Sequence, residues 1–350
     1  MTSGELDQPH LDRNVRALRS LSGAIVWAKG TIRQSAGPLR SCGSHWQPRL
    51  YLLATTSRAP MTPPAVEELL ALLQLDRLED NFFRGESRDI GTRYVFGGQV
   101  LGQALSAAQQ TVAGDRHAHS LHAYFLRAGD VEQPILYQVE RTRDGGSFSM
   151  RRVTAIQHGQ PIFNFAASFQ VDESGVEHQL PMPSVSKPND LEPTIAMPAE
   201  ELAKLPPKLQ RWFGRSGPFE FRHVHPRDEL NPPKRPPFQQ IWFRLSSRAP
   251  DSPALHRALL AYSSDFHLIG TTMFPHGISF LHRNVQVASL DHIMWFHRPF
   301  RVDEWLLYSC DSPTAQGGRG LARGMIYSED GRLVASTAQE GLIRLRPEQS

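Results

Sequence analysis

Three kinds of pattern in this 350-residue chain could do chemistry: an adjacent acid and base, paired histidines, and glycine-rich runs. Asp291 and His292 have the residue types of an acid–base pair, but neighbours in a strand point to opposite faces of a sheet and cannot form a dyad directly. His117 and His119 have a spacing that a metal ion can use, yet no cluster of Cys or carboxylates completes a site, so we expect no metal. Neither pair defines an active site.

The glycine-rich runs also lack the features of known catalytic loops. A serine hydrolase of the usual kind needs a Gly-x-Ser-x-Gly turn, and residues 145–149 lack its closing glycine. Gly97, Gly98 and Gly102 have neither the strand context nor the spacing of a nucleotide-binding loop. We expect these glycines to allow close packing of a helix on a sheet, with helix-start amides that can face a carbonyl or a phosphate.

The chain contains an internal repeat whose polar residues are divided unequally between the two copies. Residues 145–167 match residues 317–339 at a constant offset of 172. Two copies at this spacing indicate a duplicated domain and not a solenoid. Gln339 aligns with Ala167, so this amide occurs in one copy only. We therefore expect function where the copies differ, and pocket walls from the first copy.

Hydrophobic periodicity predicts the same order of elements in both halves. In the first half we expect helices over 67–78 and 96–108, then strands over 119–126, 135–141, 148–157 and 161–170. In the second half we expect a strand over 239–246, a helix over 253–264, then strands over 279–297, 305–311, 318–327 and 333–346. Prolines make a continuous sheet or long helix improbable over 172–240, except around 199–213.

Charge sets residues 1–60 apart from the rest of the chain. They hold 8 Lys and Arg against 3 Asp and Glu, whereas residues 61–350 hold 30 against 32. We expect residues 1–60 to be disordered or outside the mature fold, and favour Met61 as the true start over an organelle presequence. The balanced charge of the remainder gives no reason to expect a nucleic-acid partner.

The repeat and the prolines divide the remainder into three parts. We expect a first domain over 61–172, a proline-rich connection over 173–238 and a second domain over 239–350. With 40% hydrophobic residues, the chain can bury sizeable cores.

Apolar run length, cysteine content and expected sheet edges indicate where the protein is located and how it assembles. No apolar run reaches the 18 residues of a membrane span. Cys42 and Cys310 have neither metal spacing nor a disulfide framework, which favours a reducing compartment. We expect a cytoplasmic protein, or an organellar one if residues 1–60 are a presequence. Exposed sheet edges favour a homodimer or homotetramer.

Several motifs, in order along residues 64–346, resemble those of the type II acyl-CoA thioesterases. They are Phe-Arg-Gly at 83–85, Phe-Gly-Gly-Gln-Val at 96–100, Tyr-Phe-Leu-Arg-Ala-Gly-Asp at 124–130, Tyr-Ser-Ser-Asp-Phe at 262–266, Ser-Leu-Asp-His at 289–292 and Ala-Gln-Glu-Gly at 338–341. The resemblance implies an α+β fold of two tandem hotdog domains, each a long helix wrapped by a curved antiparallel sheet. Periodicity alone would also fit two generic α+β sandwiches.

The resemblance also implies an activity and the residues that carry it. Type II thioesterases hydrolyse fatty acyl-CoA to fatty acid and CoA, without a cofactor. Carried over residue by residue, their water-orienting groups fall on Asp265, Ser289 and Gln339, with Asp265 as the base. Ser289 stands where many relatives have Thr, which keeps the hydroxyl and loses a methyl group. Because water is the nucleophile, we expect no covalent acyl-enzyme.

Substrate contacts and two other functions complete the hypothesis. Gln99 at a helix start and His122 in a strand could line a shared site, while Arg127 and Arg298 could meet the phosphates of CoA. One alternative function is a non-catalytic acyl-CoA binding or sensing protein. The other is a hotdog dehydratase or hydratase that leaves the thioester intact. The chain-length preference depends on pocket depth, which the sequence does not give.

Overall fold

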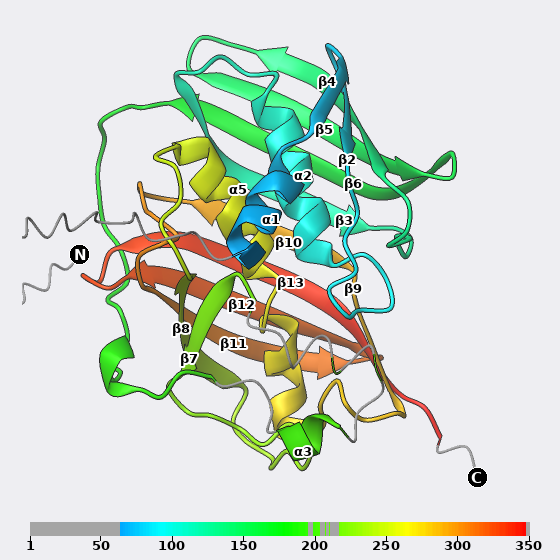
Figure 1. Cartoon of the computed structure of the whole chain (residues 1–350). Helices are drawn as coiled ribbons and strands as arrows, with labels where there is room; N and C mark the ends of the chain where they lie inside the picture. Colours follow the sequence, from blue (N-terminus) through cyan, green and yellow to red (C-terminus); the bar gives the residue numbers. More distant parts are fainter. Residues whose placement is uncertain (1–63, 195–198, 204–206, 208–209, 211–216, 348–350) are drawn as a thin grey trace, which may run out of the picture. The chain divides into compact units, whose positions relative to one another are not determined.

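The computed structural model describes residues 64–194, 199–203, 207, 210 and 217–347 (Figure 1). These residues belong to one compact unit of the chain. The expectations for residues 1–60 and for a start at Met61 lie outside the described residues, as does most of the stretch 199–213, where a sheet or long helix was not excluded.

The first half consists of short elements, a central helix and four long strands. Its elements are α1 (Pro64–Leu73), β1 (Asp76–Glu79), β2 (Phe82–Gly85), α2 (Gly97–Gln109), β3 (Arg116–Phe125), β4 (Ile135–Asp144), β5 (Phe148–Gln157) and β6 (Gln160–Val171). Helix α1 ends before Leu78, where a longer helix was expected, because the chain there pairs with β2 through Arg77 and Phe83. Leu78 is accordingly half exposed, since it lies outside the helix that buries the other leucines.

The second half repeats this plan. Its elements are β7 (Phe219–His223), β8 (Phe238–Leu245), α5 (Pro253–Ser264), η2 (Ile269–His276), β9 (Val285–Ser289), β10 (Asp291–Phe296), β11 (Leu306–Gln316), β12 (Arg319–Ser328) and β13 (Leu333–Leu345). Helix α5 has the bounds that the sequence predicts. Ser252 caps its start by accepting a hydrogen bond from the backbone nitrogen of Leu255, and a proline occupies the first turn.

Within the described residues, the strands of both halves join in one antiparallel sheet. Its order is β1-β2-β4-β5-β6-β3-β10-β13-β12-β11-β8-β7, and β9 pairs with β13. The halves meet where β3 pairs with β10, with Tyr124 opposite Asp291 and Ser120 opposite Trp295. Helix α2 packs on β3, β4, β5 and β6 of the first half, and η2, which follows α5, packs on β8, β11, β12 and β13 of the second half. This is the α+β, tandem hotdog arrangement that the resemblance implies.

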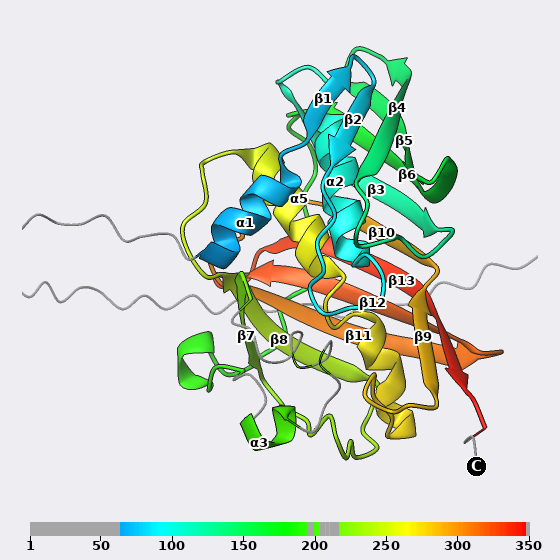
Figure 2. The ribbon, with the colours of Figure 1, turned by 45° about the vertical axis from the view of Figure 1, so that its right-hand side comes forward.

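Helices α2 and α5 lie side by side and antiparallel (Figure 2). A side chain on Gly98 would collide with the carbonyl oxygen of Tyr262, and one on Gly102 would lie 3.1 Å from that of Ala258. The sequence analysis expected these glycines to pack closely against the sheet, and this is wrong: they pack closely against helix α5. A helix face without side chains here lets two helix backbones approach each other.

The proline-rich segment covers the second half of the sheet and adds a strand to it. Strand β7 lies inside the segment expected as a connection and pairs with β8 from Phe219 to His223. Further along, Trp242 donates a hydrogen bond from Nε1 to the carbonyl oxygen of Ser186 at 2.9 Å. An apolar cluster forms on this face, separate from the main core, from Trp242, Trp305, Leu307 and Tyr327 with Met182, Val185 and Leu191 of the segment.

Candidate active site

Asp265 lies at the end of α5, where the two helices meet. It is the C-cap residue, with φ −81° and ψ −12°, and its side chain is only 6% exposed. The backbone nitrogen of Gly98 donates to its Oδ2 at 2.9 Å, and Gln339 Nε2 donates to its Oδ1 at 2.7 Å. Both carboxylate oxygens are thus held from outside the helix that carries them.

Gln339 connects Asp265 to Ser289. Its Nε2 also donates to Ser289 Oγ at 3.0 Å, so one amide group bonds both side chains. The strands that carry Gln339 and Ser289, β13 and β9, are paired with Gly341 opposite Ser289. Gln339 is fully buried, whereas Ser289 is partly exposed. The structure therefore brings together the three residues that the resemblance implies, from three separate elements.

The first half supplies a backbone donor to this group. Gly98 lies in the first turn of α2, whose free N–H groups and dipole favour a negative charge. A side chain on Gly97 would lie 2.7 Å from Asp265 Oδ2 and 3.0 Å from the Phe125 ring. The sequence analysis expected helix-start amides here to face a carbonyl or phosphate, and missed that they face Asp265. The spacing of the glycines was the available signal.

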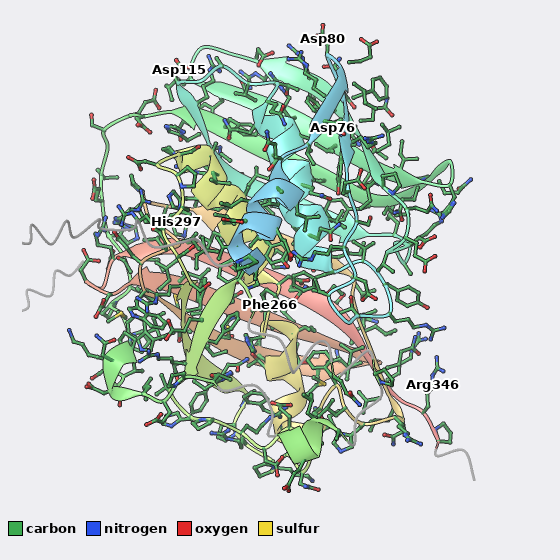
Figure 3. All side chains as sticks on the ribbon, viewed as in Figure 1. Asp76, Asp80, Asp115, Phe266, His297 and Arg346 are labelled. Carbon is green, nitrogen blue, oxygen red and sulfur yellow. The ribbon has the colours of Figure 1, made fainter. Side chains whose placement is uncertain are left out.

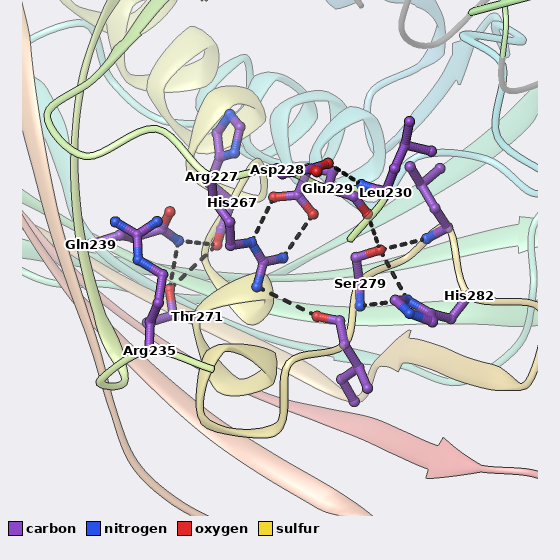
Figure 4. Close-up of polar contacts among 12 residues, drawn as sticks. Arg227, Asp228, Glu229, Leu230, Arg235, Gln239, His267, Thr271, Ser279 and His282 are labelled. Carbon is purple, nitrogen blue, oxygen red and sulfur yellow. Dashed lines mark hydrogen bonds and ion pairs between the residues drawn. The ribbon is translucent and has the colours of Figure 1, made fainter. Parts of the chain in front are cut away.

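The two residues after Asp265 fix its position. The Phe266 ring, labelled in Figure 3, lies 4.6 Å from that of Phe96 and 5.6 Å from that of Phe221. His267 follows with a left-handed φ of 66°, which is uncommon outside glycine. Gln239 Nε2 donates to the backbone oxygen of His267 at 2.8 Å (Figure 4). Ring packing and this hydrogen bond hold the turn that directs Asp265 toward α2.

Burial gives Asp265 the acidity of a base that works near neutral pH. Removal from water raises its pKa to about 6, and the hydrogen bonds from Gln339 and Gly98 oppose that rise. At pH 7 the group is mostly ionised and close to the point where it takes a proton. This balance suits a general base.

His292 is a buried neighbour of Asp265 that the sequence analysis did not include in the site. Its Nε2 lies 3.0 Å from Ser264 Oγ, and its Nδ1 lies 3.9 Å from Asp265 Oδ1. Burial lowers its pKa to about 3, so the ring is neutral at pH 7. Asp291 bonds the backbone nitrogen of Glu340 at 2.6 Å, on the other face of the strand, so the two neighbours form no dyad.

The side chains of Gln99 and His122 make their contacts with groups other than Asp265, Ser289 and Gln339. Gln99 is buried, and its side chain bonds the backbone of Glu86 and Arg88, both at 3.2 Å. His122 is exposed and meets the ring of Trp295 edge-on at 5.6 Å. Trp295 is 37% exposed while its neighbour Phe296 is buried, because strand neighbours alternate between faces.

The two arginines proposed for CoA lie near the ends of strands. Arg127 is exposed and donates from Nη1 to the backbone oxygen of Pro161 at 2.6 Å. Arg298 is partly buried and donates from Nη1 to the backbone oxygen of Leu333 at 3.0 Å. Among the described residues, no hydrogen bond joins Gln99, His122, Arg127 or Arg298 to the side chain of Asp265, Ser289 or Gln339.

Two further observations concern metals and membranes. Across residues 64–194 and 217–347 and the few described between them, no three His, Cys, Asp or Glu side chains gather as a metal ion would need. In the same part of the chain, no helix has the length and apolar character to cross a membrane.

Both halves match models of one protein family. The model described as acyl-CoA thioesterase N-terminal domain matches residues 84–170, and the model described as acyl-CoA thioesterase matches residues 217–342. Acyl-CoA thioesterase 2 of Haemophilus influenzae is 47% identical over 279 residues, which cover 80% of this chain and 98% of that protein. Acyl-coenzyme A thioesterase 8 of Homo sapiens is 42% identical over 287 residues, which cover 80% and 89%.

Solved structures agree with these matches. The acyl-CoA thioesterase II of Mycobacterium marinum superposes with a TM-score of 0.65 at 44% identity, over 79% of this chain and 98% of that one. A protein with a hotdog fold from Alicyclobacillus acidocaldarius superposes with a TM-score of 0.64 at 19% identity, over the same shares, which supports the fold alone. A tandem hotdog chain matched over both halves in this way is a thioester hydrolase of the hotdog class. The chain belongs to the type II acyl-CoA thioesterase family.

Proposed function

We propose that this protein hydrolyses fatty acyl-CoA to free fatty acid and CoA, with Asp265, Ser289 and Gln339 directing a water molecule. The observation that carries the proposal is the single amide of Gln339, which bonds both Asp265 and Ser289. A buried carboxylate and a hydroxyl are thereby held at one point, where a water and a thioester can meet.

The mechanism follows from the donors and acceptors of these groups. Asp265 takes a proton from water, and the oxygen of that water bonds to the thioester carbon. The carbon–sulfur bond then breaks, CoA leaves as a thiolate, and the proton on Asp265 passes to its sulfur. Since Ser289 Oγ accepts from Gln339, its own proton is available to the water or to the oxyanion that forms on the carbonyl oxygen.

The two alternative functions are not favoured. The matched families and relatives are named as thioesterases, and none of those named above is a dehydratase or a binding protein. The raised pKa of Asp265 also suits proton transfer, which a purely binding site does not need. Hydration of a double bond would leave the thioester whole, so release of CoA thiol separates that function from hydrolysis.

The direct test measures CoA thiol release from a medium-chain and a long-chain acyl-CoA. Asp265→Asn is expected to lose at least about a hundredfold in kcat, because a neutral amide cannot accept the proton of water. Asp291→Asn is the matched control, because it makes the same change at a carboxylate that accepts from the backbone nitrogen of Glu340 and does not contact Asp265. It is expected to keep activity. Unchanged turnover in Asp265→Asn would remove Asp265 as the base and leave the hydrolase in place.

We also propose a cytoplasmic homodimer or homotetramer that acts in fatty acid metabolism. The exposed aromatic side chains of Tyr124 and Trp295, where the two halves join, support association, and the buried free thiol of Cys310 supports a reducing compartment. Light scattering after size exclusion tests the first part, and a monomer would contradict it. Cell fractionation with an antibody tests the second. The domain limits 61–172, 173–238 and 239–350 stay part of the same proposal.

A further inference from the structure

His292 is a buried group for which the mechanism above has no role. Its side chain is 0% exposed, and its Nδ1 has no hydrogen-bond partner among the described residues. The atom lies 3.9 Å from Asp265 Oδ1, beyond hydrogen-bond distance. A buried polar atom without a partner destabilises the fold, so its retention beside a reactive carboxylate points to a use.

The hydrogen bonds of Ser264 show which nitrogen of His292 carries the proton. Ser264 Oγ donates to the backbone oxygen of Ala261 at 2.9 Å, which uses its one proton. The 3.0 Å contact between Ser264 Oγ and His292 Nε2 then requires Nε2–H to be the donor. Nδ1 of the neutral ring therefore carries a lone pair. In the resting site, two acceptors face each other across 3.9 Å.

The other groups around Asp265 favour its ionised form or stay neutral. Gly98 and Gln339 both donate to the carboxylate, which stabilises the anion. Tyr262 and Tyr308 are the other titratable neighbours, and burial raises the pKa of both, so they remain neutral. Tyr308 donates to the backbone oxygen of Ser264 at 3.0 Å. None of these contacts offers an acceptor to a protonated carboxyl.

We propose that His292 is a positioning residue for Asp265, whose Nδ1 accepts a hydrogen bond from the carboxyl once that group has taken a proton from water. This inference rests on the proposed role of Asp265 as base. The two groups repel while Asp265 is ionised and attract after it is protonated. The contact thus strengthens as the reaction proceeds, which is the condition for accelerating it.

The step balances without a change in the proton count of His292. Water loses a proton to Asp265 and its oxygen bonds to the thioester carbon, while His292 keeps its Nε2 proton. When CoA leaves, the Asp265 proton passes to sulfur and the contact with His292 opens again. Gln339 Oε1 is also buried without a partner among the described residues, but this amide turns its nitrogen toward Asp265.

The test is the pH profile of kcat/KM for a variant that removes Nδ1 of His292 and for a control. His292→Gln keeps an amide near the Nε2 position and loses Nδ1. Asp291→Asn changes the strand neighbour of His292, keeps both ring nitrogens and is the control. The acidic limb of His292→Gln is expected to move to lower pH by at least about half a unit, the scale of one hydrogen bond, while that of Asp291→Asn stays in place. His292→Asn, whose amide oxygen reaches the Nδ1 position, is expected to restore the limb in part.

Each other outcome overturns the proposal in a distinct way. A limb that does not move in His292→Gln means that the residue has a structural role only, and a limb that moves to higher pH means that Nδ1 donates to the carboxylate. If the variants fail to fold, 15N NMR of the wild-type protein gives the tautomer directly, and a proton on Nδ1 contradicts the proposal. Failure of the proposed role of Asp265 as base shows separately, as full turnover in Asp265→Asn, and failure of the hydrolase function shows as no release of CoA thiol by the wild type.

Discussion

The buried charged groups at the C-terminal ends of α2 and α5 have opposite signs in the two halves of the repeat. At the end of α2, Thr111 Oγ1 accepts a hydrogen bond from Arg151 Nε at 2.8 Å, and this guanidinium is buried. Its Nη2 also bonds Asp144 Oδ1 at 2.7 Å. At the end of α5, the buried charge is the carboxylate of Asp265. The offset of 172 makes Arg323 the counterpart of Arg151, yet Arg323 is 57% exposed and pairs with Asp311.

The two buried charges also differ in how completely their surroundings are bonded. Arg151 donates to a hydroxyl, a carboxylate and three backbone oxygens, which uses its donors in full. Around Asp265, Gln339 Oε1 and His292 Nδ1 are left without partners among the described residues. One half saturates its buried charge, whereas the other leaves two acceptors unpaired beside the carboxylate that we propose as the base.

Removal of the saturated charge tests the structural half of the comparison. Arg151→Met is expected to lower the free energy of unfolding by about 3 kcal/mol or more, because several buried partners lose their donor. Arg323→Met is the matched control, and an exposed ion pair contributes about 1 kcal/mol or less. Urea unfolding followed by circular dichroism measures both. Equal losses would mean that the two arginines are equivalent despite their different burial.

The next largest expected effect is a loss of turnover when a residue of the second half is replaced by its counterpart in the first half. Gln339→Ala installs the residue that stands at the equivalent position 167. It is expected to fold and to lose about a hundredfold in kcat, the cost of one preorganised donor. Thiol release measures the loss. Ala167→Gln is the reverse change. A gain of activity in this variant would show that the first half already holds the other groups of a catalytic site.

The charge of Asp265 links activity and stability to pH with opposite signs. Its folded pKa of about 6 lies above the ordinary value of 3.8, so the folded protein binds the proton more tightly than the unfolded chain does. Stability therefore falls as pH rises from about 4 to about 6, by up to about 3 kcal/mol, whereas kcat/KM rises through about pH 6. Asp265→Asn is expected to melt higher than the wild type at pH 7. An unchanged melting temperature would show that burial does not strain this charge.

The smallest expected effect lies at the hydroxyl. Ser289→Ala is expected to lose about tenfold in kcat, the scale of one hydrogen bond, because Gln339 still positions Asp265 while one donor disappears. Ser289→Thr keeps the hydroxyl and is expected to stay within a few-fold of the wild type. Ser120→Ala changes the counterpart at an offset of 169 and serves as the control. Greater harm from Ser120→Ala than from Ser289→Ala would reverse the assignment of the two halves.

Local signals in the sequence predicted helices and strands better than the contacts between residues far apart in the chain. Helix α5 was predicted to the residue because a cap, a proline and a periodic apolar face mark it. Strand β7 was missed, because prolines on both sides hid a short alternating segment. The contact of Gly98 with Asp265 spans 167 residues and depends on how two helices cross. The proximity of His292 to Asp265 depends likewise on strand register, which no single segment encodes.

The long-range hydrogen bonds of Asp265 also set the order in which the enzyme can become active during synthesis. The Gly98 donor leaves the ribosome early, Asp265 follows, and Gln339 on β13 comes 74 residues later. A nascent chain can fold its first half while the second is still being translated. It gains the complete group only after β13 pairs beside β9 and β10. Completion of this group is thus a late event that reports the finished pairing of both halves, and a chain cut short before β13 lacks Gln339.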